Sequence, residues 1–252
     1  MKWPMKIIAH RGASHDAPEN TLAAINLAWQ QHADAVEIDV HLSKDGKLVA
    51  IHDATTKRTC GVSGKVSERT LAELKTWDVG KWKGSQWAGE KIPTLEEVLA
   101  NVPKDKGLVI EIKGGPELLP ELKRVLKRSA LKPGQIFLAS FSLPTMTLVK
   151  RTIPDHEAYW ITGFRRRTPS RRWSPAPTRL IQRAKKASLD GLDLYANGPI
   201  NSEFVHQVRE AGLKLYVWTV DSVAPALKLI AAGVDGLTTN RPGWLREKLR
   251  PL

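Results

Sequence analysis

The chain has 252 residues, a length typical of one α/β barrel domain, and no stretch approaches the ~18 apolar residues of a membrane-spanning helix. Lys and Arg outnumber Asp and Glu by 39 to 26, so the formal charge of +13 favours anionic partners such as phosphates, anionic lipid or nucleic acid. The single cysteine, Cys60, excludes an internal disulfide and a thiolate metal cluster. The first ten residues carry charge too early for a secretory signal, so a soluble cytoplasmic protein is expected.

Short apolar segments of high β propensity recur along the chain. They predict eight strands, at residues 6–9, 35–40, 108–112, 136–140, 158–162, 191–194, 215–219 and 236–239. Amphipathic segments lie between them, at 20–31, 94–102, 116–129, 142–152, 178–187, 201–212 and 222–233. Strands that are apolar throughout and alternate with helices predict a parallel sheet covered on both faces. A (β/α)8 TIM barrel over residues 1–252 is its simplest closure.

Polar residues and glycines mark the ends of several predicted helices. The expected N-caps are Asn20, Thr94, Ser142 and Asn201, and the expected C-terminal stops are Gly212 and Gly233. A further β segment, 48–53, follows the segment AVEIDVHL, residues 35–42, after only five residues, so the two must form an antiparallel hairpin that turns at residues 44–46. We expect this hairpin to pair Ser43 with Leu48, His41 with Ala50 and Asp39 with His52.

Two segments depart from a bare barrel. Residues 54–92 are rich in turns and tryptophan, and we expect a small inserted subdomain on the catalytic end, after the second barrel strand. Residues 163–178 predict a long Arg-rich loop after the fifth strand. Nine Lys or Arg residues and no acid lie between Glu157 and Asp190. Such a run is either a solvated face or a surface that gathers anionic substrate or lipid head groups.

Three acids occupy predicted barrel strands, where an unpaired carboxylate is costly to bury. Glu37 and Asp39 stand two apart, so they point the same way, and Glu111 enters from the next barrel strand. Three oxygen ligands suit one hard divalent cation, Mg²⁺, Ca²⁺ or Mn²⁺. The alternative is a salt-bridge cluster with Arg11 and Lys113.

His10 and His52 are the expected proton carriers, because imidazole titrates near physiological pH. Arg11 and Lys113 supply a planar cation and a point charge, both suited to phosphate. A metal, two cations and two histidines together predict chemistry at a phosphodiester.

Other polar residues of the first and second βα units have simpler interpretations. Asn20 is expected to start the first barrel helix, and Glu19 either favours the dipole of that helix or touches the site. Trp218 is either a flat wall for a glycerol backbone or a core residue. The residues expected to lie outside the catalytic set are His15, Asp16, His41 and Asp53.

With these residues assembled, the chain resembles the glycerophosphodiester phosphodiesterase family. The resemblance rests on an ordered series of motifs from residue 9 to 242: AHRGA, PENT, VEIDVHLSKDGKLVAIHD, RTCGVSGKVSERTLAEL, GEKIPTLEEVL, LVIEIK, VWTVD and GLTTNRP. It implies a barrel with an inserted subdomain, a divalent ion, and hydrolysis of a glycerophosphodiester to sn-glycerol 3-phosphate and an alcohol.

Position by position, the resemblance implies roles for nine residues. His10 and His52 match the acid/base histidines. The other matches are phosphate-binding Arg11 and Lys113, metal ligands Glu37, Asp39 and Glu111, and pocket residues Glu19 and Trp218. In the mechanism that the resemblance implies, the substrate's own 2-hydroxyl attacks phosphorus, and water then opens the cyclic phosphate.

The expected partner is a small-molecule glycerophosphodiester, with no nucleic acid and with transient contact to an anionic membrane surface left open. One alternative is the same chemistry on lysophospholipids at a membrane surface, with the basic loop as the docking element. Another, of a different class, is a non-catalytic barrel that binds anions or nucleic acid. The sequence leaves open the preferred alcohol, the native ion, the oligomeric state and which histidine acts first as base.

Overall fold

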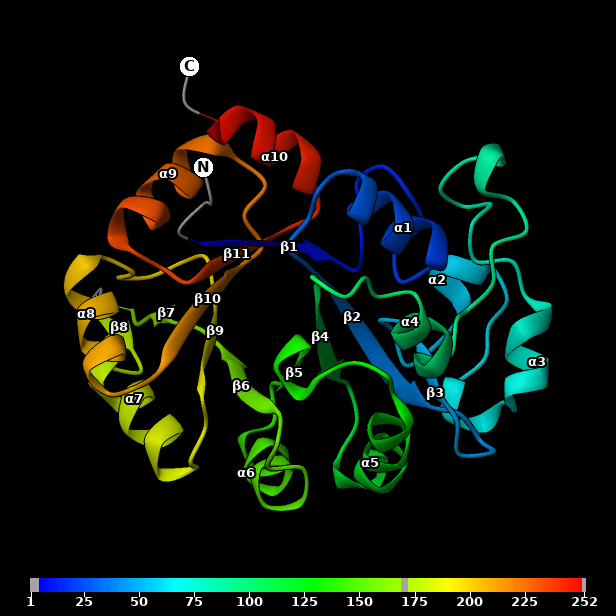
Figure 1. Cartoon of the computed structure of the whole chain (residues 1–252), viewed down its shortest axis with the longest axis horizontal. Helices are drawn as coiled ribbons and strands as arrows, with labels where there is room; N and C mark the ends of the chain where they lie inside the picture. The colour runs from blue at the N-terminus through cyan, green and yellow to red at the C-terminus, as the bar shows by residue number, and fades with distance from the viewer. Residues whose placement is uncertain (1–4, 169–171, 251–252) are drawn as a thin grey trace.

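Eight parallel strands close into a barrel in the computed structural model, which describes residues 5–168 and 172–250 (Figure 1). The strands follow the order β1–β11–β10–β9–β6–β5–β4–β2, and β1 pairs with β2 to complete the circle. This confirms the predicted TIM barrel. The strands are β1 Lys6–His10, β2 Ala35–Leu42, β4 Gly107–Ile112, β5 Ile136–Ser140, β6 Glu157–Thr162, β9 Gly191–Tyr195, β10 Lys214–Trp218 and β11 Gly236–Thr239.

Helices surround the barrel, and each predicted helical segment contains one. They are α1 Leu22–Gln30, α4 Leu95–Ala100, α5 Leu119–Arg128 (preceded by η3 Pro116–Leu118), α6 Leu143–Thr152, α7 Pro177–Lys186, α8 Ser202–Glu210, α9 Val223–Ala232 and α10 Pro242–Leu249. The short η4 Pro133–Gln135 precedes β5. Helix α10 was not predicted, because its first residues, Pro242-Gly243, are typical of a turn. No helix within the described ranges is long and apolar enough to cross a membrane.

The helices pack on the barrel through apolar faces, and aromatic residues fill its interior. In α5 the buried residues are Leu119, Leu122, Val125 and Leu126, at helical spacing. Inside the barrel, the ring of Tyr159 packs edge-on against Phe137 and Tyr216, with centroids 6.2 and 5.1 Å apart. This apolar plug closes the barrel below the ends of the strands, so polar strand residues nearer those ends face an open mouth.

A short antiparallel strand, β3 Leu48–Ala50, folds back on β2 as predicted, but in a different register. Val40 pairs with Ala50 and His41 with Val49, so the predicted pairing of His41 with Ala50, and with it Asp39 with His52, is wrong by one residue. The loop contains three residues, because the Ser43 backbone N–H donates to the Lys47 carbonyl. Gly46 closes the loop at φ +73°. His52 therefore lies beyond β3, in the following loop.

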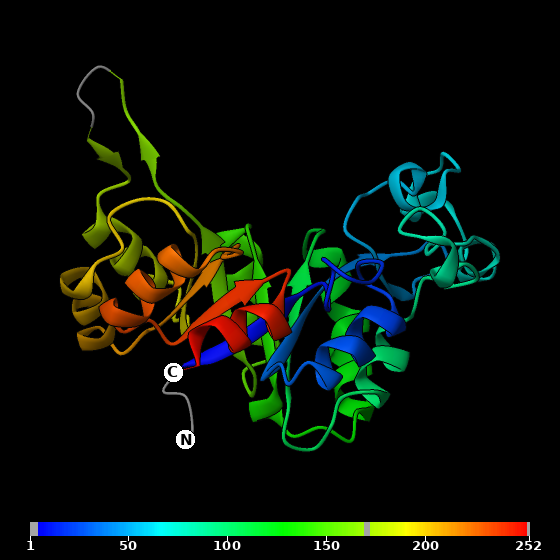
Figure 2. The ribbon, with the colours of Figure 1, turned by 90° about the horizontal axis from the view of Figure 1, so that it is seen from above.

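Two segments rise from one side of the barrel (Figure 2). The first lies between β3 and α4 and contains α2 Lys57–Cys60, η1 Val66–Glu68, α3 Leu71–Thr76 and η2 Ser85–Trp87. The second follows β6 and contains a hairpin of β7 Arg165–Arg166 and β8 Trp173–Ser174, where a loop was predicted. Arg171, part of that predicted loop, lies outside the described residues. Both segments follow carboxyl ends of barrel strands, so they flank the mouth where barrel enzymes carry their sites.

Candidate active site

Three buried carboxylates meet at the mouth of the barrel. Glu37 and Asp39 come from β2, and Glu111 stands beside Asp39 on neighbouring β4. One oxygen from each lies within 4.8 Å of the others. The predicted convergence of these side chains is therefore present, and no other such group of metal-ligating side chains was found in the described ranges.

Two cations contact the carboxylate cluster. Arg11 Nε lies 3.2 Å from Asp39 Oδ2, and the Arg11 backbone N–H donates to Glu37 Oε2 at 2.9 Å. Lys113 Nζ lies 2.9 Å from Asp39 Oδ1 and 2.5 Å from Glu111 Oε1. Glu37 Oε1 is buried without a hydrogen-bond partner in the described structure. Three acids against two cations leave the cluster one positive charge short of neutrality.

The surroundings shift the pKa values of the three carboxylates in different directions. Burial, with repulsion from Asp39 and Glu111, raises the pKa of Glu37 well above its usual value. Burial and Asp39 raise the pKa of Glu111 to about 7. Burial also opposes ionisation of Asp39, but Lys113 and Arg11 outweigh it and lower the Asp39 pKa. A cation bound among the three oxygens would let Glu37 and Glu111 ionise together with Asp39.

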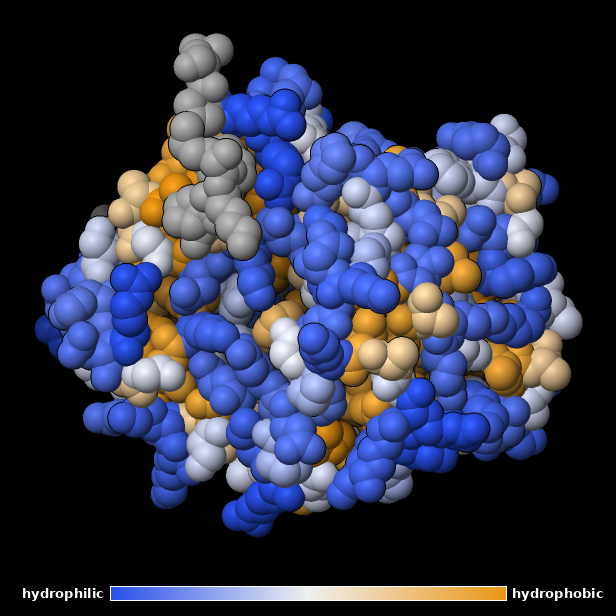
Figure 3. Space-filling view, viewed as in Figure 1, coloured by the Kyte–Doolittle hydropathy of each residue, from blue (hydrophilic) through white to orange (hydrophobic). Residues whose placement is uncertain are grey.

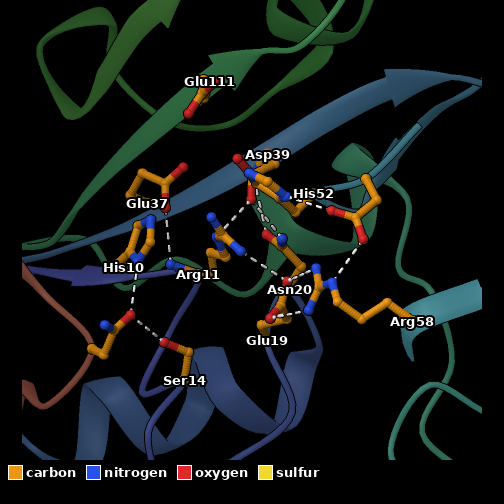
Figure 4. A network of polar contacts seen from close by, with 12 residues as sticks. His10, Arg11, Ser14, Glu19, Asn20, Glu37, Asp39, His52, Arg58 and Glu111 are labelled. Atoms are coloured by element: carbon orange, nitrogen blue, oxygen red, sulfur yellow. Dashed lines mark hydrogen bonds and ion pairs between the residues drawn. The ribbon is translucent and has the colours of Figure 1, made fainter. Parts of the chain in front are cut away.

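His10 ends β1 and lies beside Glu37 in Figure 4, where β1 and β2 pair. Its Nδ1 is 2.7 Å from Asn240 Oδ1. Burial and the nearby charge of Arg11 lower the pKa of His10, against smaller opposing effects of Asn240 and Asp39. The two larger effects favour the neutral form of the ring, the form that can accept a proton.

His52 lies beside Asp39 in Figure 4 and is held by a chain of charged groups. Its Nδ1 lies 2.7 Å from Asp53 Oδ1, and Asp53 Oδ2 accepts from Arg58 Nε at 2.7 Å. Arg58 also donates to both oxygens of Glu19, at 2.7 and 2.8 Å, and Glu19 accepts from Arg11 at 3.0 Å. The bond from Arg58 holds the pKa of Asp53 at about 2. The sequence did not predict this contact of Asp53, because residues 52 and 53 lie beyond β3, where their side chains turn toward each other.

Asn20 is not the N-cap of α1, contrary to the sequence prediction. Thr21 occupies that position, and its Oγ1 accepts from the Ala24 N–H at 3.2 Å. Asn20 is buried with φ +58°, donates from Nδ2 to Asp39 Oδ2 at 2.8 Å and accepts from the Asp39 N–H at 3.1 Å. Its backbone N–H donates to the Arg11 carbonyl. Asn20 therefore holds a carboxylate of the site in place.

Trp218, at the end of β10, stands between two aromatic rings across the mouth. Phe141 and Tyr195 pack against it at 5.6 and 5.4 Å, nearly perpendicular to the indole, and are 54% and 48% exposed. Phe141 also lies 5.8 Å from Lys113 Nζ. The indole thus belongs to an aromatic wall that continues from the cluster to solvent, and sequence reasoning missed Phe141 and Tyr195.

Two further histidines have local partners. His15 pairs with its exposed neighbour Asp16 at 2.7 Å, which agrees with a loop role. His41 Nε2 lies 3.0 Å from the carbonyl oxygen of His52 and so supports the loop that carries His52.

The chain is similar to known proteins both in sequence and in structure. Residues 10–244 match the glycerophosphoryl diester phosphodiesterase family. A glycerophosphodiester phosphodiesterase of Caldanaerobacter subterraneus subsp. tengcongensis is 36% identical over 250 residues, 97% of each chain. Another, from Bacillus subtilis, is 32% identical over 93% of this chain and 83% of its own. A phosphodiesterase of Oleispira antarctica, solved in complex with the product sn-glycerol-3-phosphate, superposes with a TM-score of 0.84 at 31% identity, over 97% of this chain and 96% of its own. The chain therefore belongs to the glycerophosphoryl diester phosphodiesterase family.

Proposed function

We propose that the protein hydrolyses glycerophosphodiesters, deacylated phospholipids such as glycerophosphocholine or glycerophosphoethanolamine, to sn-glycerol 3-phosphate and an alcohol. As a member of its family, the chain is a phosphoric diester hydrolase. The observation that carries the proposal is the meeting of three buried carboxylates, two cations and two histidines at one end of the barrel. The Oleispira phosphodiesterase, solved with sn-glycerol-3-phosphate, supports the same product here.

The proposal assigns one divalent cation, Mg²⁺, Ca²⁺ or Mn²⁺, to Glu37, Asp39 and Glu111. The donor set fits, because hard cations prefer carboxylate oxygens and Glu37 Oε1 has no partner within the described residues. When bound, such a cation supplies positive charge to a phosphoryl oxygen. Arg11 and Lys113 flank the same cluster and would bind the other phosphate oxygens.

The two histidines divide the proton transfers of the proposed reaction. One takes the proton of the substrate's 2-hydroxyl as its oxygen bonds to phosphorus, and the other protonates the alcohol oxygen as its bond to phosphorus breaks. In the second step, water opens the cyclic phosphate with the two roles reversed. This sequence of steps is the one that the family resemblance implies, and the positions of His10 and His52 beside the carboxylate cluster support it.

Glu19 and Trp218 complete the proposed pocket in different ways. Glu19 contacts both Arg11 and Arg58, so it orients the phosphate-binding guanidinium. The aromatic wall of Phe141, Tyr195 and Trp218 offers flat apolar surface to the carbon atoms of glycerol or of the head group.

A coupled assay for glycerol 3-phosphate release, run over a panel of head groups and one lysolipid, tests this function. We expect release from at least one soluble diester, its loss with EDTA and its return with excess Mg²⁺ or Ca²⁺. His10→Ala and His52→Ala should each lose most of the activity. Activity that survives both chelation and His10→Ala would overturn the mechanism.

A second candidate is hydrolysis of lysophospholipids at an anionic membrane, and the β7–β8 hairpin favours it. The hairpin projects beyond the mouth (Figure 2), and Arg165 and Arg166 on β7 are exposed. Arg166 lies 5.3 Å from the Trp173 ring centroid, which pairs a cation with an aromatic residue suited to a lipid interface.

Vesicle binding distinguishes the second candidate from the first. The double variant Arg165→Glu/Arg166→Glu should lose sedimentation with vesicles that contain anionic lipid and keep its rate on soluble diester. A control, Lys104→Glu/Lys132→Glu, changes the same charge at exposed sites away from the hairpin and should keep both. Equal vesicle binding by both variants would reject the hairpin as a docking element. Nucleic acid is not an expected partner, and the cytoplasmic location stays a prediction from the sequence.

A further inference from the structure

Asn240, the residue that follows the carboxyl end of β11, contacts His10 at the mouth. Its Oδ1 lies 2.7 Å from His10 Nδ1 and accepts from Ser14 Oγ at 2.9 Å. An amide oxygen is an acceptor only, so both groups that face it must supply a proton. Ser14 supplies its hydroxyl proton, and His10 must supply a proton on Nδ1.

Asp221 fixes which end of the Asn240 amide faces His10. Asp221 Oδ2 accepts from Asn240 Nδ2 at 2.6 Å, and Asp221 Oδ1 accepts from the Asn240 backbone N–H and from Thr239 Oγ1, both at 2.8 Å. An ionised carboxylate has no proton to donate, so the amide NH₂ must face Asp221. The amide oxygen is then directed at His10, and rotation of the amide would break bonds at both ends.

The two histidines have different partners at the same ring atom. His10 Nδ1 faces a neutral amide, whereas His52 Nδ1 faces the Asp53 carboxylate, itself held by Arg58. A neutral acceptor fixes a tautomer without adding negative charge, whereas a carboxylate also stabilises the imidazolium. Active sites give one titratable group the role of base and another the role of acid by surrounding the two groups with different partners.

We propose that Asn240, oriented by Asp221, is a positioning residue that keeps the proton of His10 on Nδ1 and so makes Nε2 the proton acceptor of the first step. In Figure 4, the ring edge opposite the Asn240 bond faces Glu37 and the carboxylate cluster. Within the proposed function, on which this inference rests, His10 takes the proton of the 2-hydroxyl as that oxygen bonds to phosphorus. His52 gives a proton to the alcohol oxygen as the phosphorus–oxygen bond of that alcohol breaks. In the second step, the water oxygen bonds to phosphorus while His52 takes its proton, and the bond from phosphorus to the 2-oxygen breaks while His10 returns its proton to that oxygen.

The tautomer is measurable in the resting protein, without any activity. The ¹⁵N shifts of the His10 ring, assigned by comparison with His10→Gln, should show a protonated Nδ1 and an unprotonated Nε2 at neutral pH. Asn240→Leu, which removes the acceptor at similar volume, should convert His10 to a mixture of tautomers. A His10 ring with the proton on Nε2 in the wild-type protein would overturn the proposal.

The kinetic test separates positioning from structural support. Asn240→Leu should lower kcat about 10–100-fold, as lost orienting partners of site residues commonly do, with KM within about 2-fold. The double variant Asn240→Asp/Asp221→Asn exchanges the two groups, so that the new amide can donate to the new carboxylate. It should recover part of kcat and move the acid limb of the kcat profile to higher pH, because a carboxylate favours the imidazolium. The charged groups that face His10 from the other elements, namely Arg11, Glu19, Glu37 and Asp39, are the same in all these variants. Asp221→Asn frees the Asn240 amide to rotate, so its kcat should lie between those of the wild type and Asn240→Leu.

Asn101→Leu, at the end of α4 and outside the site, is the matched control and should keep wild-type kcat and Tm. A purely structural role would lower Tm in Asn240→Leu and leave the wild-type pH profile in Asn240→Asp/Asp221→Asn, and that pair of results would reject the proposal. Wild-type protein that releases no glycerol 3-phosphate from any diester would instead reject the proposed function, while the ¹⁵N measurement would still decide the tautomer.

Discussion

At the scale of single residues, the site depends on groups that never touch the substrate. Asn20 adopts φ +58°, a left-handed conformation that asparagine tolerates better than most residues, and so directs its amide at both the backbone N–H and the carboxylate of Asp39. Both bonds are buried, where an unpaired partner is costly. One residue thus fixes the position of a predicted metal ligand.

Replacing Asn20 should separate the backbone contribution from the hydrogen bonds. Asn20→Gly keeps the left-handed backbone and loses the amide, so it should cost about 1–3 kcal/mol of unfolding free energy. Asn20→Ala adds about 1–2 kcal/mol of backbone strain. Urea denaturation of the metal-free proteins measures both. If Asn20→Gly and Asn20→Ala lose the same free energy of unfolding, the backbone conformation contributes nothing to stability. If neither variant loses any, the two hydrogen bonds contribute nothing.

Site residues were predictable from the sequence where they lie inside or directly after a strand. Glu37, Asp39 and Glu111 stand out because charged residues interrupt apolar strands, and the parallel topology then brings them together. Asn20 was misassigned as an N-cap, because its role depends on a left-handed backbone. The contact of Asp53 with His52 was not predicted, because it depends on the exact end of β3. Asn240 was missed although it follows a predicted strand, since its partners His10 and Asp221 are identified only by contacts across the closed barrel.

At the scale of elements, helix α2 ties the segment between β3 and α4 to the mouth through one side chain. Arg58 binds Asp53 and Glu19 with 2.7–2.8 Å contacts, although its own side chain is 42% exposed. The β2–β3 hairpin brings the chain to this point, and its three-residue loop sets which residues follow β3. A sequence shows that such a hairpin exists, but loop length fixes its register, and one residue of error moved His52 onto the wrong partner.

Loss of the Arg58 guanidinium should therefore disturb His52 more than it disturbs the fold. We expect Arg58→Ala to lower kcat on the order of 10-fold, because Asp53 loses the group that orients it. Exposed ion pairs contribute little to stability, so Tm should change little. Arg58→Lys keeps the positive charge but cannot contact Asp53 and Glu19 with the same geometry, so its kcat should be intermediate. Steady-state kinetics measures the loss of kcat, and hydrogen exchange over residues 54–66 measures the local stability. A wild-type kcat in Arg58→Ala would refute the role given to the contacts of Arg58 with Asp53 and Glu19.

At the scale of the whole molecule, a net positive charge contrasts with a cluster of buried carboxylates at the mouth of the barrel. The excess of 13 positive charges is spread over a surface whose visible face in Figure 3 is mostly hydrophilic, with smaller hydrophobic areas between the polar side chains. The carboxylate cluster is buried at the mouth. A positive surface attracts an anionic diester from a distance, and the buried acids then exclude an anion unless cations neutralise them. We therefore expect both pH and a bound cation to act on the whole protein through this cluster.

Metal binding should therefore stabilise the fold more at pH 8 than at pH 5. Burial and Asp39 raise the pKa of Glu111 from its usual 4.5 to about 7, so its ionisation destabilises the metal-free fold progressively as pH rises through that window. Asp39 has a lowered pKa and stays ionised throughout. A cation needs the ionised carboxylates, so protons compete with it more strongly at pH 5 than at pH 8.

Thermal unfolding with EDTA, or with Mg²⁺ or Ca²⁺ in excess, measures this linkage. At about 100 times the dissociation constant a ligand adds about 2.7 kcal/mol, which for a chain of this size raises Tm by about 5–10 °C. We expect that shift at pH 8 and a much smaller one at pH 5. Glu111→Gln removes both the ligand and the titrating group, so its metal-free protein should lose less stability between pH 5 and pH 8 than wild type, and its Tm should respond weakly to metal at either pH. A larger shift at pH 5, or none at pH 8 for any of the candidate ions, would reject the three carboxylates as a metal site and leave the salt-bridge cluster with Arg11 and Lys113 as their explanation.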